Sequence, residues 1–327
     1  MPQHVTDNIE MMPDVPVARE DLGAGGTSRG AGARSPLFWK VLLLSVAIIW
    51  GYSFTTMKDA LDTIPVFELL YVRFLPAALV MFVIFHKRII AHLNARNLIV
   101  GLGMGTLMWA AYVLQTVGLA HTTAGKNAFL TGTYCILVPF ASFFLSGEKL
   151  TRYNLGAALL CLAGIGLVAL DSVEFNIGDA ITLGGAVFFA IQMAVTAKYG
   201  RKMDINVITF WMFVGNGILS LVSSLLFETQ APLSVWTPNF ICVMAFLSVG
   251  CTCVALLIQN VGLAHVPAST GSLLLSMESP SGVLFSVLLM GEALTSRLLA
   301  GFVLIFLSII LSETHFDFLR RKPRPQL

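Results

Sequence analysis

The chain has 327 residues, of which 56% are apolar and only 12% are Asp, Glu, Lys or Arg. A soluble protein carries about 25% charged residues, so this composition excludes an ordinary soluble enzyme and predicts a protein of the lipid bilayer. The net charge is only +2 and no long basic run is present, which argues against a nucleic-acid partner.

The two ends of the chain differ in composition from its middle. Residues 1–37 are rich in Gly, Pro and charged residues and show no apolar period, which predicts a disordered tail. Residues 316–327 include Arg320, Arg321, Lys322 and Arg324. They predict a basic tail that lies against anionic headgroups.

Ten apolar segments lie between the tails, each about 20 residues long, which is enough for a helix to cross about 30 Å of hydrocarbon. We expect them at residues 39–58, 65–85, 98–118, 124–145, 150–170, 178–200, 205–227, 238–261, 267–290 and 295–315. They do not alternate apolar and polar residues as the strands of a membrane barrel do. The predicted fold class is therefore an all-α integral membrane protein.

The distribution of Lys and Arg predicts the orientation, because these residues collect in cytoplasmic loops. With the N-terminus inside, only Lys58, Lys126 and Arg297 lie near the outer face, and Arg73 lies within a helix. We therefore expect both termini in the cytoplasm and the protein in the inner or plasma membrane of the cell.

The chain also contains an internal repeat. Residues 115–151 align without gaps on residues 259–295, at an offset of 144. The motif QTVGLAH at 115–121 matches QNVGLAH at 259–265, and GEKLT at 147–151 matches GEALT at 291–295. Five predicted crossings separate each motif from its copy, and this odd number inverts the second copy in the membrane.

The predicted organisation is thus two inverted five-helix repeats, at residues 38–170 and 178–315. Inverted repeats are typical of secondary transporters, because two similar half-bundles can alternate between inward-open and outward-open shapes around one site.

Several short motifs resemble the EamA repeats of the drug/metabolite transporter superfamily. They are WGYSF at 50–54, RF at 73–74, TAGKNAFLT at 123–131, LVP at 137–139, MES at 277–279 and GE at 291–292. The resemblance covers roughly residues 40–315. It implies ten helices around a central cavity and substrates that range over amino acids, other metabolites and toxic compounds, most often exported. Pro280 follows Glu278 by two positions, where many members have proline directly after the acid.

Glu278 is the leading functional candidate, because ionisable side chains at membrane depth are costly and usually functional. It lies about 11 residues into its segment, hence about 16 Å deep. Apolar surroundings disfavour the charged carboxylate, so Glu278 is a candidate for proton coupling or for binding a substrate ammonium. The alternative is a neutral acid hydrogen-bonded to backbone that Pro280 leaves free.

Polar and aromatic side chains at helical spacing form a candidate substrate pathway. Its predicted members are Trp50, Phe54, Trp109, Tyr112, Asn127, Thr131, Tyr134, Gln192 and Glu278. The repeat places Tyr134 opposite Glu278. Ordinary helix packing and hydrogen bonds between helices are the alternative explanation for these residues.

Two cations in or near the membrane have separate predicted roles. Lys126 is a candidate charge partner for Glu278 or a substrate carboxylate, or else an anchor that extends toward water. Arg73 is expected outside the cavity helices as a structural charge, paired with backbone carbonyls or a nearby acid.

We expect a secondary transporter that exports a small metabolite, amino acid or toxic compound by alternating access, with or without proton coupling. An uptake carrier or exchanger of the same fold, a channel or scaffold, and a membrane-embedded enzyme are the alternatives. An enzyme is disfavoured because the six His are scattered over loops and tails, and no cofactor or metal is expected. The expected partners are a small-molecule substrate and the lipid bilayer, and a monomer is compatible with the sequence.

Overall fold

The computed structural model of the protein describes residues 35–122, 124–169, 176–290 and 296–314. The regular structure in these ranges is helical, with no strand. The predicted tails, apart from residues 35–37, and the motif copy at 291–295 lie outside the described residues. So does the side chain of Lys126.

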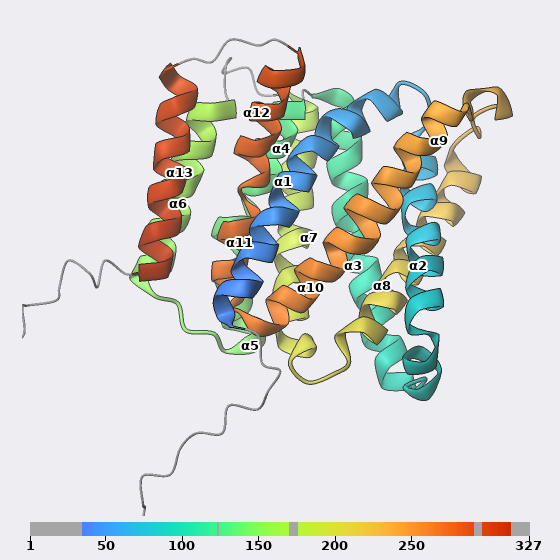
Figure 1. Ribbon diagram of the computed structural model, residues 1–327, viewed down its shortest axis with the longest axis horizontal. Helices are drawn as coiled ribbons and strands as arrows, with labels where there is room; N and C mark the ends of the chain where they lie inside the picture. The colour runs from blue at the N-terminus through green and yellow to red at the C-terminus, as the bar shows by residue number, and fades with distance from the viewer. Residues whose placement is uncertain (1–34, 123, 170–175, 291–295, 315–327) are drawn as a thin grey trace, which may run out of the picture. The chain divides into compact units, whose positions relative to one another are not determined.

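The helices follow one another closely along the chain (Figure 1). They are α1 (Pro36–Leu61), α2 (Val66–Ala91), α3 (Ala95–His121), α4 (Ala124–Gly132), α5 (Tyr134–Ser146), α6 (Arg152–Ala169), α7 (Ile177–Gly200), α8 (Ile205–Phe227), the short 3₁₀ turn η1 (Leu233–Val235), α9 (Pro238–Ala245), the π-helix η2 (Phe246–Val254), α10 (Ala255–His265), α11 (Ala268–Leu275), α12 (Glu278–Met290) and α13 (Ser296–Thr314). Each predicted apolar segment is helical over most of its described residues.

Six helical stretches in the described ranges are long and apolar enough to cross a membrane. They are Pro36–Leu61, Val66–Ala91, Ala95–His121, Ile177–Gly200, Ile205–Phe227 and Pro238–His265. The prediction of an all-α membrane fold is confirmed for the described residues, and the remaining apolar helices are shorter.

Polar side chains determine where several helices begin. Ser35 precedes α1, and its hydroxyl accepts a hydrogen bond from the amide of Phe38 at 3.3 Å. Before α7, the side chain of Asn176 accepts from the amide of Asp179, and the Asp179 carboxylate accepts from the amide of Asn176, both at 3.0 Å. Such reciprocal caps satisfy amides that lack a partner within the helix.

Two of the predicted segments are each broken into two helices. Segment 124–145 is interrupted at Thr133, between α4 and α5, and segment 267–290 at Ser276 and Met277, between α11 and α12. Thr133 and Met277 occupy the same position of the repeat. Pro280 accounts for the second break, because its ring lacks an N–H and clashes with the carbonyl four residues earlier. Pro139 lies inside α5, well after the first break, so a bend at this proline does not explain it.

The two broken helices have equivalent neighbours. Helix α1 packs against α11 and α12, and α7 packs against α4 and α5. The α4–α5 pair and the α11–α12 pair run in opposite directions, and α6 and α13 pack against each other at one edge (Figure 1). Each broken helix is thus supported by one long helix from the other half of the chain.

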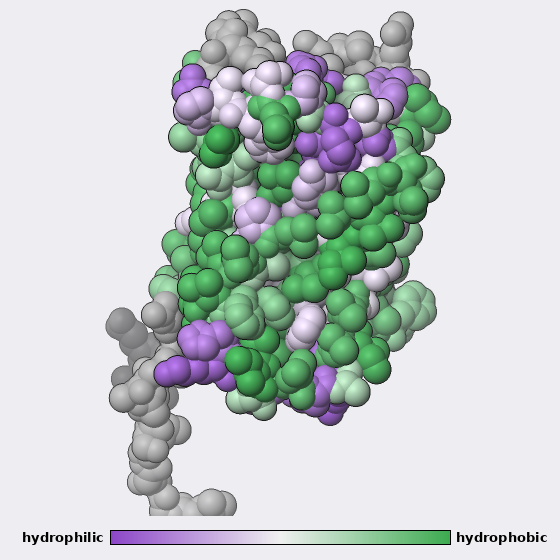
Figure 2. Space-filling model, turned by 90° about the vertical axis from the view of Figure 1, so that its right-hand side faces the viewer, coloured by the Kyte–Doolittle hydropathy of each residue, from purple (hydrophilic) through white to green (hydrophobic). Residues whose placement is uncertain are grey.

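The surface carries an apolar band between polar ends. Figure 2 shows green apolar residues across the middle of one face, with purple polar residues gathered above and below. Leu79, Val83 and Ile84 of α2 and Leu225 of α8 are among the large apolar side chains that are mostly exposed. Soluble monomers rarely expose a patch of this extent, whereas acyl chains would cover it.

Helices α3 and α8 approach each other closely at two glycines. A Cβ atom added to Gly105 would lie 2.7 Å from the carbonyl oxygen of Met212 and 3.1 Å from the Cα of Gly215. Gly101 also faces α8, whereas a Cβ on Gly103 would meet nothing within 4 Å. The spacing of four between Gly101 and Gly105 therefore permits backbone contact, as small residues do between membrane helices.

Gly105→Ala is expected to destabilise the protein by about 1–3 kcal/mol, because overpacking at a backbone contact forces the two helices apart. Gly103→Ala is the matched control, since it makes the same change in the same helix where space is open. Thermal unfolding of the two variants in detergent checks this prediction. Equal melting temperatures would show that the α3–α8 contact does not depend on a missing side chain.

Candidate functional site

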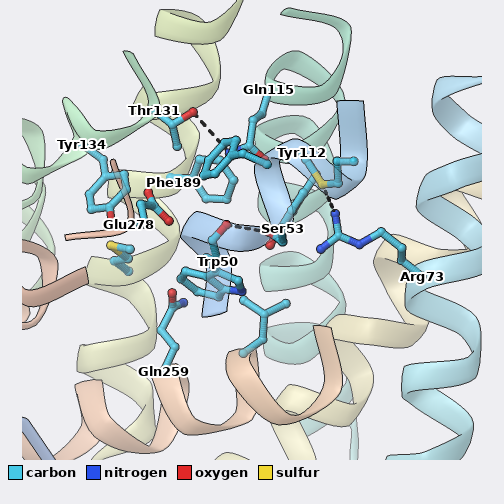
Figure 3. Close-up of a pocket in the computed structure, with 14 residues that line it drawn as sticks. Trp50, Ser53, Arg73, Tyr112, Gln115, Thr131, Tyr134, Phe189, Gln259 and Glu278 are labelled. Carbon is cyan, nitrogen blue, oxygen red and sulfur yellow. Dashed lines mark hydrogen bonds between the residues drawn. The ribbon is translucent and has the colours of Figure 1, made fainter. Parts of the chain in front are cut away.

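A pocket with a cavity volume of about 30 Å³ lies inside the helix bundle (Figure 3). Its lining comes from α1, α2, α3, α4, α5, α7, α10 and α12. The lining residues are Trp50, Ser53, Phe54, Met57, Arg73, Tyr112, Gln115, Thr131, Tyr134, Phe189, Met193, Leu256, Gln259 and Glu278. Sites for small molecules are mostly apolar with a few converging polar groups, as here, but they commonly measure about 300–1,000 Å³. This pocket would therefore have to widen to hold a substrate.

Many predicted pathway residues meet at this pocket. The structure brings together Trp50, Phe54, Tyr112, Thr131, Tyr134 and Glu278 from both halves of the sequence.

Three predicted pathway residues lie outside the lining. The Asn127 amide nitrogen donates to the carbonyl of Gln115 at 3.0 Å and to the hydroxyl of Thr182 at 2.8 Å, so this side chain links α4 to α3 and α7. The Gln192 amide nitrogen donates to the hydroxyl of Thr196 at 2.9 Å, within α7. Trp109 is partly buried on α3.

Glu278 and Tyr134 lie side by side at one end of the pocket (Figure 3). Each is the first residue of the second half of a broken helix, and they are 144 positions apart. Glu278 is 4% exposed and Tyr134 is 2% exposed. Within the described structure, Oε1 of Glu278 and the Tyr134 hydroxyl have no hydrogen bond of good geometry, although the two side chains are close enough to interact with each other. A buried polar group without a partner costs about 1–3 kcal/mol, so both groups are available to a ligand.

The position of Glu278 also suits a carboxylate. It lies in the first turn of α12, where the helix dipole favours negative charge. Two effects on the carboxyl group of Glu278 therefore oppose each other. Burial disfavours the charged carboxylate, and the N-terminus of α12 favours it.

Arg73 lines the pocket, although it was expected outside the cavity helices. It is 1% exposed and is the only residue of α2 among the described lining. Its Nε donates to the hydroxyl of Thr252 at 3.2 Å, its Nη1 donates to the sulfur of Met57 at 2.7 Å, and its guanidinium lies 5.1 Å from the ring centroid of Tyr112. These partners differ from the predicted carbonyls or acid. The long side chain of Arg73 reaches the pocket, whereas the other described residues of α2 do not line it.

The π-helix η2 holds two of the lining residues in place. The indole nitrogen of Trp50 donates to the carbonyl of Cys251 at 2.8 Å, and the hydroxyl of Ser248 donates to the carbonyl of Arg73 at 2.8 Å. Single π-helical turns occur frequently at functional sites. Here the wider turn presents backbone and hydroxyl groups to α1 and α2.

Several lining residues were missed from the sequence. They are Ser53, Met57, Gln115, Phe189, Met193, Leu256 and Gln259. The repeat contains a signal for two of them, because Gln115 and Gln259 are the first residues of the two matching motifs. Among the described residues no cluster of His, Cys, Asp and Glu could hold a metal ion.

Comparison with known proteins identifies the family. The EamA-like transporter family matches the chain twice, over residues 37–170 and 176–314. The chain belongs to the EamA-like transporter family. An "Uncharacterized transporter" of Archaeoglobus fulgidus is 30% identical over 86% of this chain and 88% of its own length. The "Uncharacterized transporter YoaV" of Bacillus subtilis is 26% identical over 86% of this chain and 99% of its own length.

A solved structure supports the fold of this EamA-family chain. It is titled "Crystal structure of protein", and it superposes with a TM-score of 0.70 at 18% identity, over 88% of this chain and all of its own. At that identity the likeness concerns the fold alone. The family match and the apolar helices together describe a multi-pass membrane transporter.

Two cations hold carbonyl groups at equivalent positions of the EamA repeat. Lys58, near the end of α1, donates to the carbonyls of Leu119, Ala120 and Thr122 at 2.8, 3.3 and 3.1 Å. Arg201, at the end of α7, donates to the carbonyl of Val266 at 3.2 Å. Thr122 and Val266 are repeat mates, and α1 and α7 end at opposite ends of the bundle (Figure 1). Among the described residues, a cation thus links two helices at each end of the bundle.

Proposed function

We propose that this protein is a secondary transporter that carries a small molecule across the membrane by alternating access. Ten crossings, arranged as two inverted five-helix repeats at residues 38–170 and 178–315, would form the carrier. The offset of 144 residues, the opposite directions of the two broken helices and their equivalent neighbours support this arrangement. Inverted repeats with broken helices at a central site are typical of such carriers.

The buried pair of Glu278 and Tyr134, whose polar atoms make no hydrogen bond of good geometry, is the observation that carries this proposal. Both groups begin a half-helix, both are buried, and both open onto a pocket lined from each half of the chain. In the proposed carrier the substrate binds in this pocket, against the aromatic side chains of Trp50 and Tyr112.

Glu278 is the proposed proton-coupling residue. The titratable or charged side chains that share its pocket are Tyr134 on α5, Tyr112 on α3 and Arg73 on α2. Proton binding and release at a single buried carboxyl would couple a proton gradient to the change of state. Lys126 remains a predicted charge partner.

The proposed location is the cell membrane, with both termini in the cytoplasm. The start of α1 and the end of α13 lie on the same side of the bundle (Figure 1). The link from α2 to α3 and the link from α7 to α8 meet there, where Arg88 and Asp204 form an ion pair at 3.7 Å. Arg96 and Lys202 border the same surface hollow, as expected of a cytoplasmic face. Export is the proposed direction.

A ligand screen followed by flux measurement tests the proposed function. Amino acids, nucleosides, polyamines and toxic cations are first screened for thermal stabilisation of the purified protein, since a ligand that binds only the folded state raises its melting temperature. Stabilising compounds are then followed in proteoliposomes. The proposal predicts saturable flux of a chemically unchanged compound. Conversion of the compound would indicate an enzyme, and flux without saturation would indicate a channel.

A further inference from the structure

The pocket contains a buried cation without an anionic partner in the described structure. Arg73 contacts a hydroxyl, a thioether and an aromatic ring, and a thioether is only a weak acceptor. Glu68, the other buried charged residue of α2, is occupied elsewhere, because its carboxylate accepts from the amide of Ala231 at 2.8 Å. An arginine at membrane depth costs at least about 2.5–3.5 kcal/mol when unpaired, which favours a ligand that brings the missing anion.

Glu278 does not supply that anion. The guanidinium of Arg73 and the carboxyl of Glu278 lie at opposite ends of the pocket, with Ser53 and Tyr112 between them (Figure 3). No ion pair joins Arg73 to Glu278 in the described part of the chain. The pocket therefore presents a cation at one end and a carboxyl beside a phenol at the other, with aromatic and apolar side chains and a few hydroxyl and amide groups lining the rest.

We propose that Arg73 determines the specificity of the pocket and that the substrate is a small organic carboxylate with an apolar or aromatic body. This inference rests on the proposed function of the pocket as the carrier's substrate site. The substrate carboxylate would replace the sulfur of Met57 as acceptor for Nη1, a much stronger hydrogen bond because both partners are charged. When the pocket widens to admit the substrate, the body of the substrate lies against Trp50 and Tyr112, and a donor at its far end reaches Glu278.

The charge of the pocket favours a carboxylate over a phosphate. Arg73 is the one Lys or Arg among the described lining residues, and a single guanidinium balances one negative charge. Its planar donors match a carboxylate in two parallel hydrogen bonds. A phosphate monoester carries about two charges at neutral pH, and the second would be buried without a partner.

Matched ligands test the inference on the unmodified protein. Indole-3-acetate and indole-3-acetamide share the same indole body, but the first carries a carboxylate and the second a neutral amide. Tryptamine carries an ammonium group on the same body. Binding to the purified full chain is measured by thermal shift and calorimetry, alongside a panel of aliphatic, aromatic and hydroxy acids with their amides. We expect carboxylates to bind about tenfold or more tightly than their amides. Equal affinity for carboxylates and amides, or no binding of any carboxylate in the panel, overturns the inference.

Substitutions at Arg73 provide the second test. Arg73→Gln is expected to remove the preference for carboxylate over amide, and Arg73→Lys to restore part of it, because lysine keeps the charge but not the planar donors. Arg96→Gln is the control, since it removes the same charge from an exposed position. If a folded Arg73→Gln variant still prefers carboxylates over amides as strongly as the wild type, the inference is contradicted. If that variant does not fold, the comparison of matched ligands on the wild-type protein decides the question. Saturable flux of amides or ammonium compounds alone would overturn the inference while leaving the carrier function standing.

Discussion

Glu278→Gln is expected to abolish proton-driven flux while leaving the protein folded. The amide is nearly the same size as the carboxyl and keeps an acceptor oxygen, but it cannot bind and release a proton. Because Oε1 of Glu278 has no partner among the described residues, its replacement breaks no observed hydrogen bond at that atom. Substrate flux is measured in proteoliposomes at several pH values and with an imposed pH gradient. In the variant, the flux should depend neither on the pH nor on the gradient.

Glu148→Gln is the matched control for this experiment. Glu148 lies just after α5, outside the pocket lining, and its Oε1 accepts a hydrogen bond from Ser269 at 3.2 Å. Its replacement should leave the pH dependence of flux unchanged. Flux through Glu278→Gln that equals the wild-type flux at every pH would refute the role proposed for Glu278.

Lys58→Met is expected to open the outer end of the pocket. The ammonium of Lys58 donates to three carbonyls at the end of α3, and hydrogen bonds from a charged donor are each worth about 1.5–3 kcal/mol. Methionine has a similar length but donates nothing, so the link between α1 and α3 is lost. A cysteine at Thr131, in a variant without the five native cysteines, should then react several-fold faster with a membrane-impermeant thiol reagent added outside.

Arg201→Met tests the other end of the bundle. Because Arg201 holds a single carbonyl, that of Val266, its loss should give a smaller increase in labelling, and from the inside. Lys87→Met serves as the control, since Lys87 is exposed. If Lys58→Met and Lys87→Met label at the same rate from outside, the Lys58 link does not close the pocket.

The helices themselves could be predicted from hydropathy. A backbone in lipid must satisfy its own hydrogen bonds, and a long apolar segment does so by forming a helix. The repeat carried more information than any single motif. The repeat pairs Tyr134 with Glu278 from the sequence alone, and the structure places these residues next to each other at the pocket.

Residues whose position depends on tertiary contacts could not be predicted in the same way. Helical spacing put Asn127 on one face with Thr131, but its amide reaches α3 and α7 instead of the pocket. The position of Arg73 depends on Thr252 in a π-helix, and the sequence offers no period that reports one extra residue per turn. The neighbouring helices decide how far a side chain reaches and where a helix widens into a π-helix.

Counterflow is the most direct measurement of whether one pocket serves both sides of the membrane. Proteoliposomes are loaded with a labelled compound that stabilises the purified protein, and the same unlabelled compound is added outside. A carrier that alternates around a single site predicts faster loss of label as the outside concentration rises, up to saturation. Loss of label at a rate that does not respond to the outside compound would contradict alternating access.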